Sequence, residues 1–180
     1  IANMSIVGFI VTLIPRDQVD AVKQKEPKTE IGPQNGTPYA ARRETLLSSI
    51  QLPCNPPPWG TLTAVDLNNG NIKWQIPFGA VRDIAPVPLP INYGVPNLGG
   101  PVTTASGLIF IGAALDNYIR AYDIETGKEL WKGRLPAGGQ ATPMTYRLRK
   151  DSKQFVVIAA GGHGRAGTKI GDSLIAYALP

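Results

Sequence analysis

The chain has 180 residues, a formal net charge of +5, and 43% hydrophobic against 17% charged residues. This balance excludes a disordered chain and a highly charged fibre, and the length is typical of one domain. Glycine and proline make up about a fifth of the chain without a collagen-like period, and both are costly inside helices, so strands and turns are favoured. The basic residues are scattered without interleaved aromatics, which indicates a solvated face, or one near anionic lipid, rather than a nucleic-acid partner.

The apolar start of the chain, residues 1–14, is too short to cross a membrane and lacks the basic start of a signal peptide. Its pattern indicates a chain that begins inside a strand, so we expect the C-terminal part of something longer. Residues from about 17 to 58 are polar and rich in proline. Because few structureless loops in compact domains are so long, we predict a functional or interface insertion there. Cys54 is the only cysteine, so an internal disulfide is excluded.

A tandem repeat organises the remainder of the chain. The spacing A-x-D-x-x-x-G-x-x-x-W runs from Ala64 to Trp74 and recurs 57 residues later from Ala121 to Trp131. A third copy begins at Ala176. Each glycine follows a short β-rich run, at a place where a hairpin turn often needs a positive φ.

The same pattern predicts several short strands per repeat. We expect strands over residues 62–67, 72–76, 108–113, 118–124, 129–134, 155–160 and 173–179. Four strands per unit of about 57 residues, repeated in tandem, predict the blades of a β-propeller, with each tryptophan wedged between neighbouring blades. A tryptophan in an isolated sandwich core would not explain why the whole spacing recurs. The chain supplies about three blades, and the rest of the ring is expected from sequence outside it.

A glycine-rich segment, GHGRAG at 162–167, follows the predicted strand 155–160. It matches G-x-G-x-x-G, but a dinucleotide fold needs a helix, a second strand and an acidic residue about 20 positions on. Only 13 residues follow Gly167, which excludes that fold. What remains is a loop of small residues around His163, where backbone can approach a flat ligand and the imidazole supplies one donor and one acceptor. A purely structural histidine is the alternative.

Other catalytic interpretations of this loop are weaker. The chain has no second histidine for a zinc cluster, and Ser173 lacks the nucleophile-elbow context of a Ser-His-Asp triad.

Asp116 occupies a turn before the predicted strand 118–124. An aspartate there usually accepts hydrogen bonds from local backbone, and beside a redox centre it could instead bind a sugar hydroxyl or orient a base.

Motifs along the whole chain resemble the C-terminal third of membrane-bound dehydrogenases of bacteria that use pyrroloquinoline quinone (PQQ) to oxidise glucose. The motifs are WGTLTAVD at 59–66, PNLGGP at 96–101, LPAGGQATPMTY at 135–146, AGGHG at 160–164 and GDSLIAYALP at 171–180. Quinate and polyol dehydrogenases are close relatives. The resemblance implies an all-β fold, an eight-bladed quinoprotein propeller of which residues 1–180 form about the last three blades. It also implies a place on the periplasmic side of the inner membrane, tethered by an N-terminal membrane domain.

The resemblance further implies an enzyme that binds PQQ with Ca²⁺ or Mg²⁺ and passes electrons to ubiquinone. The implied reaction is oxidation of a sugar, D-glucose to gluconolactone, with quinate, shikimate or a polyol as alternative substrates. The catalytic base is expected upstream of residue 1, so no catalytic residue is predicted in this chain. An alternative of another class is a non-enzymatic propeller scaffold, which would keep the tryptophans but does not account for the LGG segment at 98–100 or the GHG segment at 162–164.

Four residues acquire roles when the resemblance is carried over by position. His163 corresponds to a residue that contacts PQQ, and Leu98 to an apolar contact with the plane of the cofactor. Asn3 corresponds to a PQQ-contacting asparagine. Asp116 corresponds to an acidic residue near the substrate or the metal.

Overall fold

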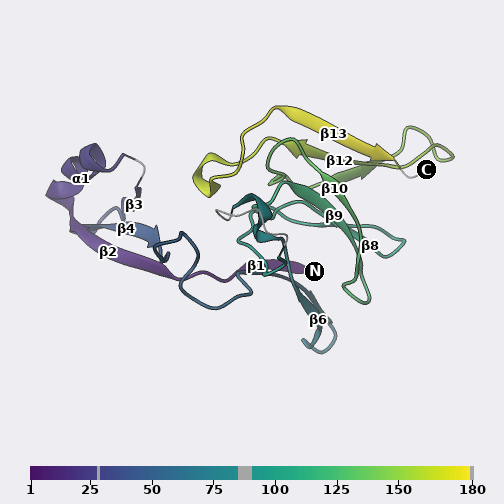
Figure 1. Cartoon of the computed structure of the whole chain (residues 1–180), viewed down its shortest axis with the longest axis horizontal. Coiled ribbons are helices and arrows are strands. Elements are labelled where there is room, and N and C mark those ends of the chain that lie inside the picture. Colours follow the sequence, from purple (N-terminus) through teal and green to yellow (C-terminus); the bar gives the residue numbers. More distant parts are fainter. Residues whose placement is uncertain (28, 85–90, 179–180) are drawn as a thin grey trace. The chain divides into compact units, whose positions relative to one another are not determined.

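The computed structural model describes residues 1–27, 29–84 and 91–178 (Figure 1). The chain forms two compact units. One comprises Ile1–Ile6 and Pro57–Pro180 and is called the propeller unit here. The other, Val7–Pro56, is called the insertion unit because it interrupts the first sheet of the propeller unit.

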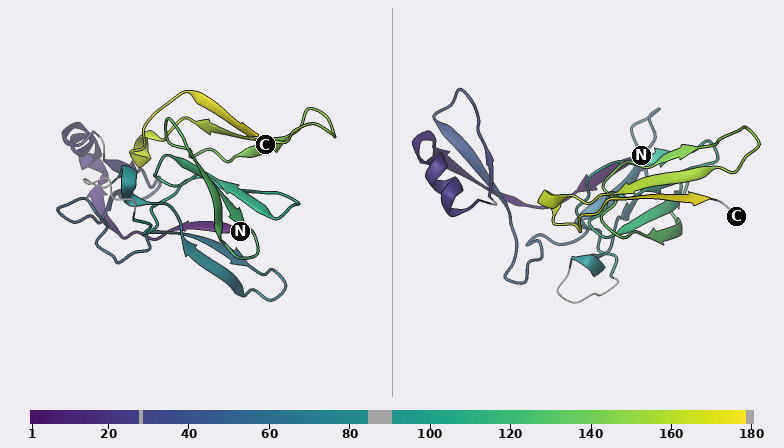
Figure 2. Two further views of the ribbon diagram at one scale, coloured as in Figure 1. Left: turned by 45° about the vertical axis from the view of Figure 1, so that its right-hand side comes forward. Right: turned by 90° about the horizontal axis from the view of Figure 1, so that it is seen from above.

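The propeller unit consists of three antiparallel sheets, which lie side by side in chain order (Figure 2). The first sheet contains β1 (Ala2–Ser5), β5 (Gly60–Val65) and β6 (Ile72–Pro77). The second contains β7 (Val102–Thr103), β8 (Leu108–Ile111), β9 (Tyr118–Asp123) and β10 (Glu129–Arg134). The third contains β11 (Met144–Tyr146), β12 (Phe155–Ala160) and β13 (Ser173–Ala178). The all-β prediction is confirmed, and the number of blades in the closed ring stays a prediction.

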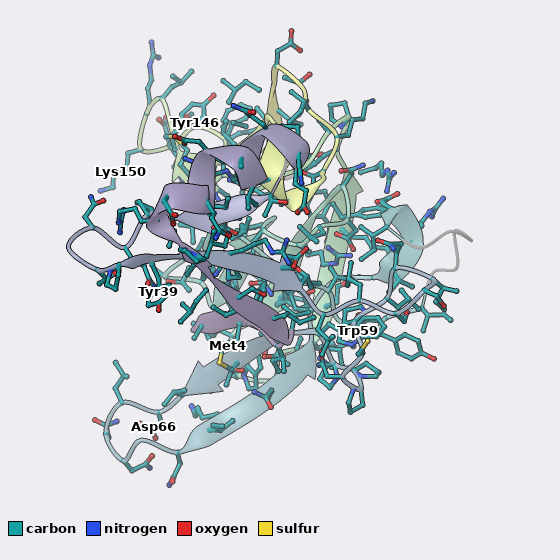
Figure 3. All side chains as sticks on the ribbon, turned by 90° about the vertical axis from the view of Figure 1, so that its left-hand side faces the viewer. Met4, Tyr39, Trp59, Asp66, Tyr146 and Lys150 are labelled. Atoms are coloured by element: carbon teal, nitrogen blue, oxygen red, sulfur yellow. The ribbon has the colours of Figure 1, made fainter. Side chains whose placement is uncertain are left out.

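The repeated Asp and Gly residues build the same turn in two sheets. The N–H of Gly70 donates to the Asp66 carbonyl at 2.8 Å, and the N–H of Gly127 donates to the Asp123 carbonyl at 2.9 Å. Both glycines have positive φ, +75° and +71°. Asp66, labelled in Figure 3, also accepts the N–H of Asn68 at its side chain. The repeat therefore specifies a β-hairpin turn in which glycine adopts the left-handed conformation.

The repeated tryptophans lie between neighbouring sheets, as predicted. Trp74 of β6 donates its indole N–H to the Ile124 carbonyl at 3.0 Å. Its ring covers Gly127, where a Cβ atom would come within 2.7 Å of the ring. Trp131 of β10 meets Tyr177 of β13 edge to face, with ring centroids 4.9 Å apart. Each indole thus links its own sheet to the next one.

A hydrophobic core fills the space between the second and third sheets. Its buried members are Phe110, Ile119, Ala121, Leu135, Ala137, Val156, Ile158 and Ala160. Alternate residues of β9 and β12 supply most of this core because successive side chains of a strand point to opposite faces. Full burial of an aliphatic side chain of this size contributes about 1.5–3 kcal/mol.

The insertion unit is a sheet in the order β2 (Phe9–Pro15), β4 (Tyr39–Thr45) and β3 (Glu30–Gly32), with helix α1 (Val19–Lys25) between β2 and β3. The predicted bounds of about 17–58 need correction at the N-terminal side, where the unit begins at Val7. The reason is that β2 pairs with β4 along all seven of its residues and so belongs to the insertion. None of the helices that the structure describes is long and apolar enough to cross a membrane.

Candidate functional site

Four loops of the propeller unit meet at one end of its sheets. The connections 112–117, 135–143 and 161–172 leave the same end because each joins an upward strand to a downward one in the antiparallel order. Residues 95–101, before β7, join them through the hydrogen bonds described below. These four segments are called the loop end. The predicted residues Leu98, Asp116 and His163 lie in them, and Asn3 contacts them from β1.

His163 follows β12 and precedes the short 3-10 helix Gly164–Ala166. Its backbone N–H donates to Thr168 Oγ1 at 2.8 Å, and its Nδ1 accepts the Ala166 N–H at 3.3 Å. A nitrogen that accepts a hydrogen bond carries no proton, so the neutral ring has its N–H at Nε2. The side chain is exposed. His163 therefore offers a donor to a ligand at the loop end.

Side chains tie the His163 loop to the second sheet. Thr168 is 8% exposed, and its Oγ1 donates to Gln140 Oε1 at 3.0 Å. Gln140 Nε2 donates in turn to the Ala114 carbonyl at 2.9 Å. Next to this bridge, the N–H of Ala113 donates to the Gly139 carbonyl at 2.6 Å. Three loops are thus joined in sequence, 161–172 to 135–143 to 112–117.

The same hydrogen-bonded run continues to Leu98 and Asn3. The Leu98 N–H donates to the Ala113 carbonyl at 2.9 Å, and the Leu98 side chain is 45% exposed. Asn3 Nδ2 donates to Asn97 Oδ1 at 2.7 Å and to the Gly99 carbonyl at 3.2 Å. The structure therefore brings the three predicted cofactor contacts, Asn3, Leu98 and His163, onto one connected set of loops.

Ala113 at the centre of this run has an unusual backbone. Its φ is +55° although it is not glycine, and it is fully buried. A residue with a Cβ atom in the left-handed region costs on the order of 1–2 kcal/mol. Both its N–H and its carbonyl are bonded to other loops of the end, and these bonds hold the strained conformation.

Asp116, in the connection 112–117, is fully buried. Its carboxylate accepts hydrogen bonds from both terminal nitrogens of Arg120, at 2.9 and 2.5 Å, and from the Ala80 N–H at 2.7 Å. Burial by itself lowers the pKa of Arg120, but the hydrogen bonds and the charge of Asp116 outweigh it, so that pKa lies above its usual value. These contacts are those of a buried ion pair that fixes the segment after β6. They differ from the local turn contacts expected of an aspartate there, and a contact with substrate or metal stays a prediction.

Sequence reasoning missed Gln140, Thr168 and Arg120. Gln140 lies inside the motif LPAGGQATPMTY, so the sequence marked this segment but gave Gln140 itself no role. Arg120 falls in the predicted strand 118–124, where a charged residue between apolar neighbours indicates a buried partner. Thr168 belongs to no pattern that the sequence shows.

The loop end has the features that PQQ requires. PQQ is flat and carries three carboxylates, so it needs close backbone approach and hydrogen-bond donors or cations. A Cβ atom on Gly100 or Gly161 would meet its nearest neighbour only at 3.4 or 3.9 Å, so the backbone can be approached there. Gly99 and Gly162 instead pack against the Gln140 and Lys169 carbonyls of neighbouring loop segments. His163 offers Nε2–H, and Arg165 and Lys169 are exposed on the same loop. Within residues 1–27, 29–84 and 91–178, no three His, Cys, Asp or Glu side chains gather as a metal site.

An apolar cleft of about 500 Å³ lies elsewhere, beside Trp131 and Tyr177. It is lined by residues such as Ser106 and Gln154, which belong to turns at the opposite end of the sheets. None of the four predicted site residues lines it. It is therefore separate from the loop end.

The chain is similar in sequence to known proteins over its whole length. Residues 1–156 match the family model "PQQ: Glucose/ethanol/alcohol dehydrogenase, beta-propeller domain". The chain is 48% identical to quinoprotein glucose dehydrogenase of Escherichia coli (strain K12), over 100% of the chain and 24% of that protein. It is 47% identical to a probable quinate dehydrogenase (quinone) of Xanthomonas campestris pv. juglandis, over 99% of the chain and 24% of that protein.

The fold is also similar to that of a europium-containing methanol dehydrogenase, with a TM-score of 0.60 and 22% identity over 98% of this chain and 30% of the other. The chain spans about a quarter of the length of the curated relatives. The repeat, the wedged tryptophans, the loop end and the match over 1–156 lead to one conclusion. The chain belongs to the family of PQQ-dependent glucose, ethanol and alcohol dehydrogenases and forms part of its β-propeller domain.

Proposed function

We propose that this chain is part of an enzyme that oxidises a sugar, D-glucose to gluconolactone, with PQQ as cofactor. The observation that supports the proposal is the connected run of loops that joins Asn3, Leu98 and His163. The His163 backbone N–H is bonded to Thr168, and its Nδ1 caps the helix Gly164–Ala166, so the exposed ring presents Nε2–H to a ligand. Family membership and the glucose dehydrogenase relatives supply the reaction class.

The residues of the loop end receive distinct roles in this proposal. When bound, PQQ supplies the acceptor for the hydride that leaves the alcohol carbon. His163 donates Nε2–H to an oxygen of the cofactor, and Leu98 packs its half-exposed side chain against the cofactor plane. Asn3 fixes the Leu98 segment through Asn97 and Gly99 and offers its amide to the cofactor. Asp116 lies on the substrate side, where its ion pair with Arg120 holds the loop in place.

The remainder of the ring is proposed to pack against the third sheet. Leu174 of β13 is 73% exposed, whereas Ile119, at the equivalent position of β9, is fully buried between two sheets. Leu174 and exposed Met144 lie on the same face of the third sheet, on either side of β12, and this face is the surface that a further blade would cover. A membrane domain, a place on the periplasmic side of the inner membrane, and ubiquinone as electron acceptor complete the proposal, since relatives are named quinone-linked dehydrogenases.

Quinate, shikimate or a polyol is the second candidate substrate class. The quinate dehydrogenase relative is nearly as similar as the glucose dehydrogenases, and a glycerol dehydrogenase large subunit of Gluconobacter thailandicus is 46% identical over 83% of the chain. Turnover of glucose, quinate and glycerol by the full-length protein, with PQQ and a ubiquinone analogue, decides between them. Glucose is expected to give the highest kcat/KM.

The full-length protein also tests the site. His163→Ala is expected to weaken PQQ binding by about ten- to a hundredfold, the effect of losing one hydrogen bond to a charged group, with little change in Tm. The control is Lys150→Ala, an exposed residue in the turn between β11 and β12, labelled in Figure 3. An unchanged PQQ titration together with a lowered Tm would assign His163 to structure. A wild-type protein that binds no PQQ and oxidises none of the substrates would reject the proposed function.

A further inference from the structure

We propose that Thr168 is a positioning residue for the cofactor site, acting with Gln140 to set the place of His163. The inference rests on the proposed function, in which His163 contacts PQQ. Thr168 itself faces the protein interior and is 8% exposed. Its effect on the cofactor therefore passes through the histidine.

The Thr168 hydroxyl is used in both directions. It accepts the backbone N–H of His163 at 2.8 Å and donates its single hydrogen to Gln140 Oε1 at 3.0 Å. Gln140 has both ends of its amide engaged, because Nε2 donates to the Ala114 carbonyl at 2.9 Å. The backbone N–H of His163 can only donate and the Ala114 carbonyl can only accept, so these two ends set the direction of the hydrogen bonds between them. The Thr168 hydroxyl also lies 3.5 Å from the His163 carbonyl, a longer contact than the one to Gln140. The bridge connects the residue that would touch the cofactor to the neighbouring sheet.

The surrounding backbone is shaped to leave room for the bridge. A Cβ atom on Gly138 would lie 2.3 Å from Gln140 Oε1 and 2.7 Å from Thr168 Oγ1. Any side chain at 138 would therefore displace one of the two bridging atoms. Because the φ of Gly138 does not require glycine, the space taken by the bridge is the reason for glycine here.

Backbone hydrogen bonds hold the same loop without help from the bridge. The N–H of Gly138 donates to the Lys169 carbonyl at 3.0 Å, and the N–H of Gly162 donates to the Gly138 carbonyl at 2.8 Å. Loss of the Thr168 hydroxyl should therefore leave the loop folded while it frees the backbone of His163. A donor that is no longer fixed binds its ligand more weakly, because the loop must be ordered on binding.

The test compares four variants of the full-length protein with wild type. Thr168→Val keeps the shape and removes the hydroxyl, and it should raise the apparent Kd for PQQ about tenfold. Thr168→Ser restores the hydroxyl and should restore the affinity. Gln140→Leu should weaken PQQ binding as well, and the double variant with Thr168→Val should add little, since both act on one bridge.

Thr63→Val is the matched control. Thr63 is a buried threonine of β5, and its hydroxyl accepts Gln75 Nε2 at 3.0 Å. This variant should lower Tm but leave the Kd for PQQ unchanged. The inference is overturned if Thr168→Val changes Tm alone, as the control does, or if serine fails to restore the affinity. Normal PQQ binding by His163→Ala would also overturn the inference, because its premise is that His163 contacts PQQ. The proposed function fails separately, when the wild-type protein binds no PQQ and oxidises none of the substrates.

Discussion

Two carboxylates, one buried and one nearer the surface, hold the segment that follows β6 against the second sheet. Asp116 is fully buried and binds Arg120 and the Ala80 N–H. Asp83 lies nearer the surface and accepts two hydrogen bonds from Arg134, at 2.7 and 2.8 Å, and the Asn117 N–H at 2.9 Å. Removing one partner of the buried pair would leave an uncompensated charge, whereas the outer pair is screened by water.

The outer pair gives the protein a dependence on acid that can be measured. Burial raises the pKa of Asp83, but the hydrogen bonds from Arg134 and Asn117 and the nearby positive charges lower it by more, so the pKa lies below its usual value. The folded pKa is thus below that of the unfolded chain, about 3.9. The stability from this group is fully present above about pH 4 and is lost as the pH falls through the folded value.

Asp83→Asn should therefore reduce the acid sensitivity of folding. At neutral pH the expected loss is below about 1 kcal/mol, because Arg134 is half-exposed. Measurements of Tm from about pH 7 to about pH 2 should show a shallower decline for the variant than for wild type. Asp151→Asn, in the turn between β11 and β12, serves as the control. Parallel curves for Asp83→Asn and wild type would contradict the assignment.

At the scale of elements, the repeated turn offers a matched pair of glycines. Gly70 and Gly127 occupy equivalent turns with φ near the same value, +75° and +71°. A Cβ atom on Gly70 would meet nothing within 4 Å, whereas one on Gly127 would come within 2.7 Å of the Trp74 ring. Alanine therefore carries the same backbone strain at both positions and an additional clash at one.

The difference between the two alanine variants measures the contact between sheets. Gly70→Ala should cost about 1 kcal/mol from the left-handed backbone. Gly127→Ala should cost a further 1–3 kcal/mol or so, because the indole must move. Denaturant unfolding of the full-length variants, followed by tryptophan fluorescence, checks both values. Equal losses would mean that Trp74 does not contribute to the packing of the two sheets.

The longer strands of the propeller unit, from β5 onward, could be predicted because their signals are local, whereas the short strands β7 and β11 lie outside the expected ranges. Glycine turns follow each β-rich run, and the repeat supplies the same spacing twice, so Trp74 and Trp131 could be placed between sheets. The hairpin of β2 and β4 could not be predicted in this way. Its strands pair Phe9 with Thr45 across an intervening helix, and β4 is polar, so no short-range pattern marks the pairing.

The candidate site was predictable only in part for a related reason. Leu98 and His163 stand in glycine-rich motifs, and the resemblance gives them roles. Thr168 and Gln140 act through side-chain hydrogen bonds between loops that are 28 residues apart in sequence. Such bonds depend on the conformation of both loops, which periodicity does not encode. The ion pair of Asp116 with Arg120 likewise follows from burial between sheets.

At the scale of the whole molecule, the first sheet keeps its pairing although the chain leaves it to form the insertion unit. The three sheets are packed as consecutive blades, and the chain spans about a quarter of its curated relatives. One sheet is interrupted by 50 residues of insertion unit without any loss of register, since Ala2 to Ser5 pair with Thr63 to Gly60. Immediately beyond, the Ile6 N–H donates to the Trp59 carbonyl at 2.8 Å.

Because the strand ends on both sides of the insertion unit are hydrogen-bonded to each other, we predict that the insertion unit can be replaced. A full-length protein with a short Gly-Ser turn in place of residues 7–56 should keep the first sheet, because no pairing of β1 with β5 uses the removed residues. Loop-closure entropy changes by only about 0.6 kcal/mol for each halving of the loop. Circular dichroism and Tm should resemble those of wild type, and a protein that no longer folds would show that the insertion unit supports the sheet.

The hydrogen bond between Ile6 and Trp59 joins the two strand ends that border the insertion unit, so the chain enters and leaves the first sheet at the same point. A segment inserted between two strand ends that are already hydrogen-bonded can lengthen, shorten or change its sequence while the first sheet keeps its pairing. The blade in which β1 and β5 are paired is therefore the natural place for new surface to be added to this domain, and the natural place for an engineer to attach a reporter or an electrode tether.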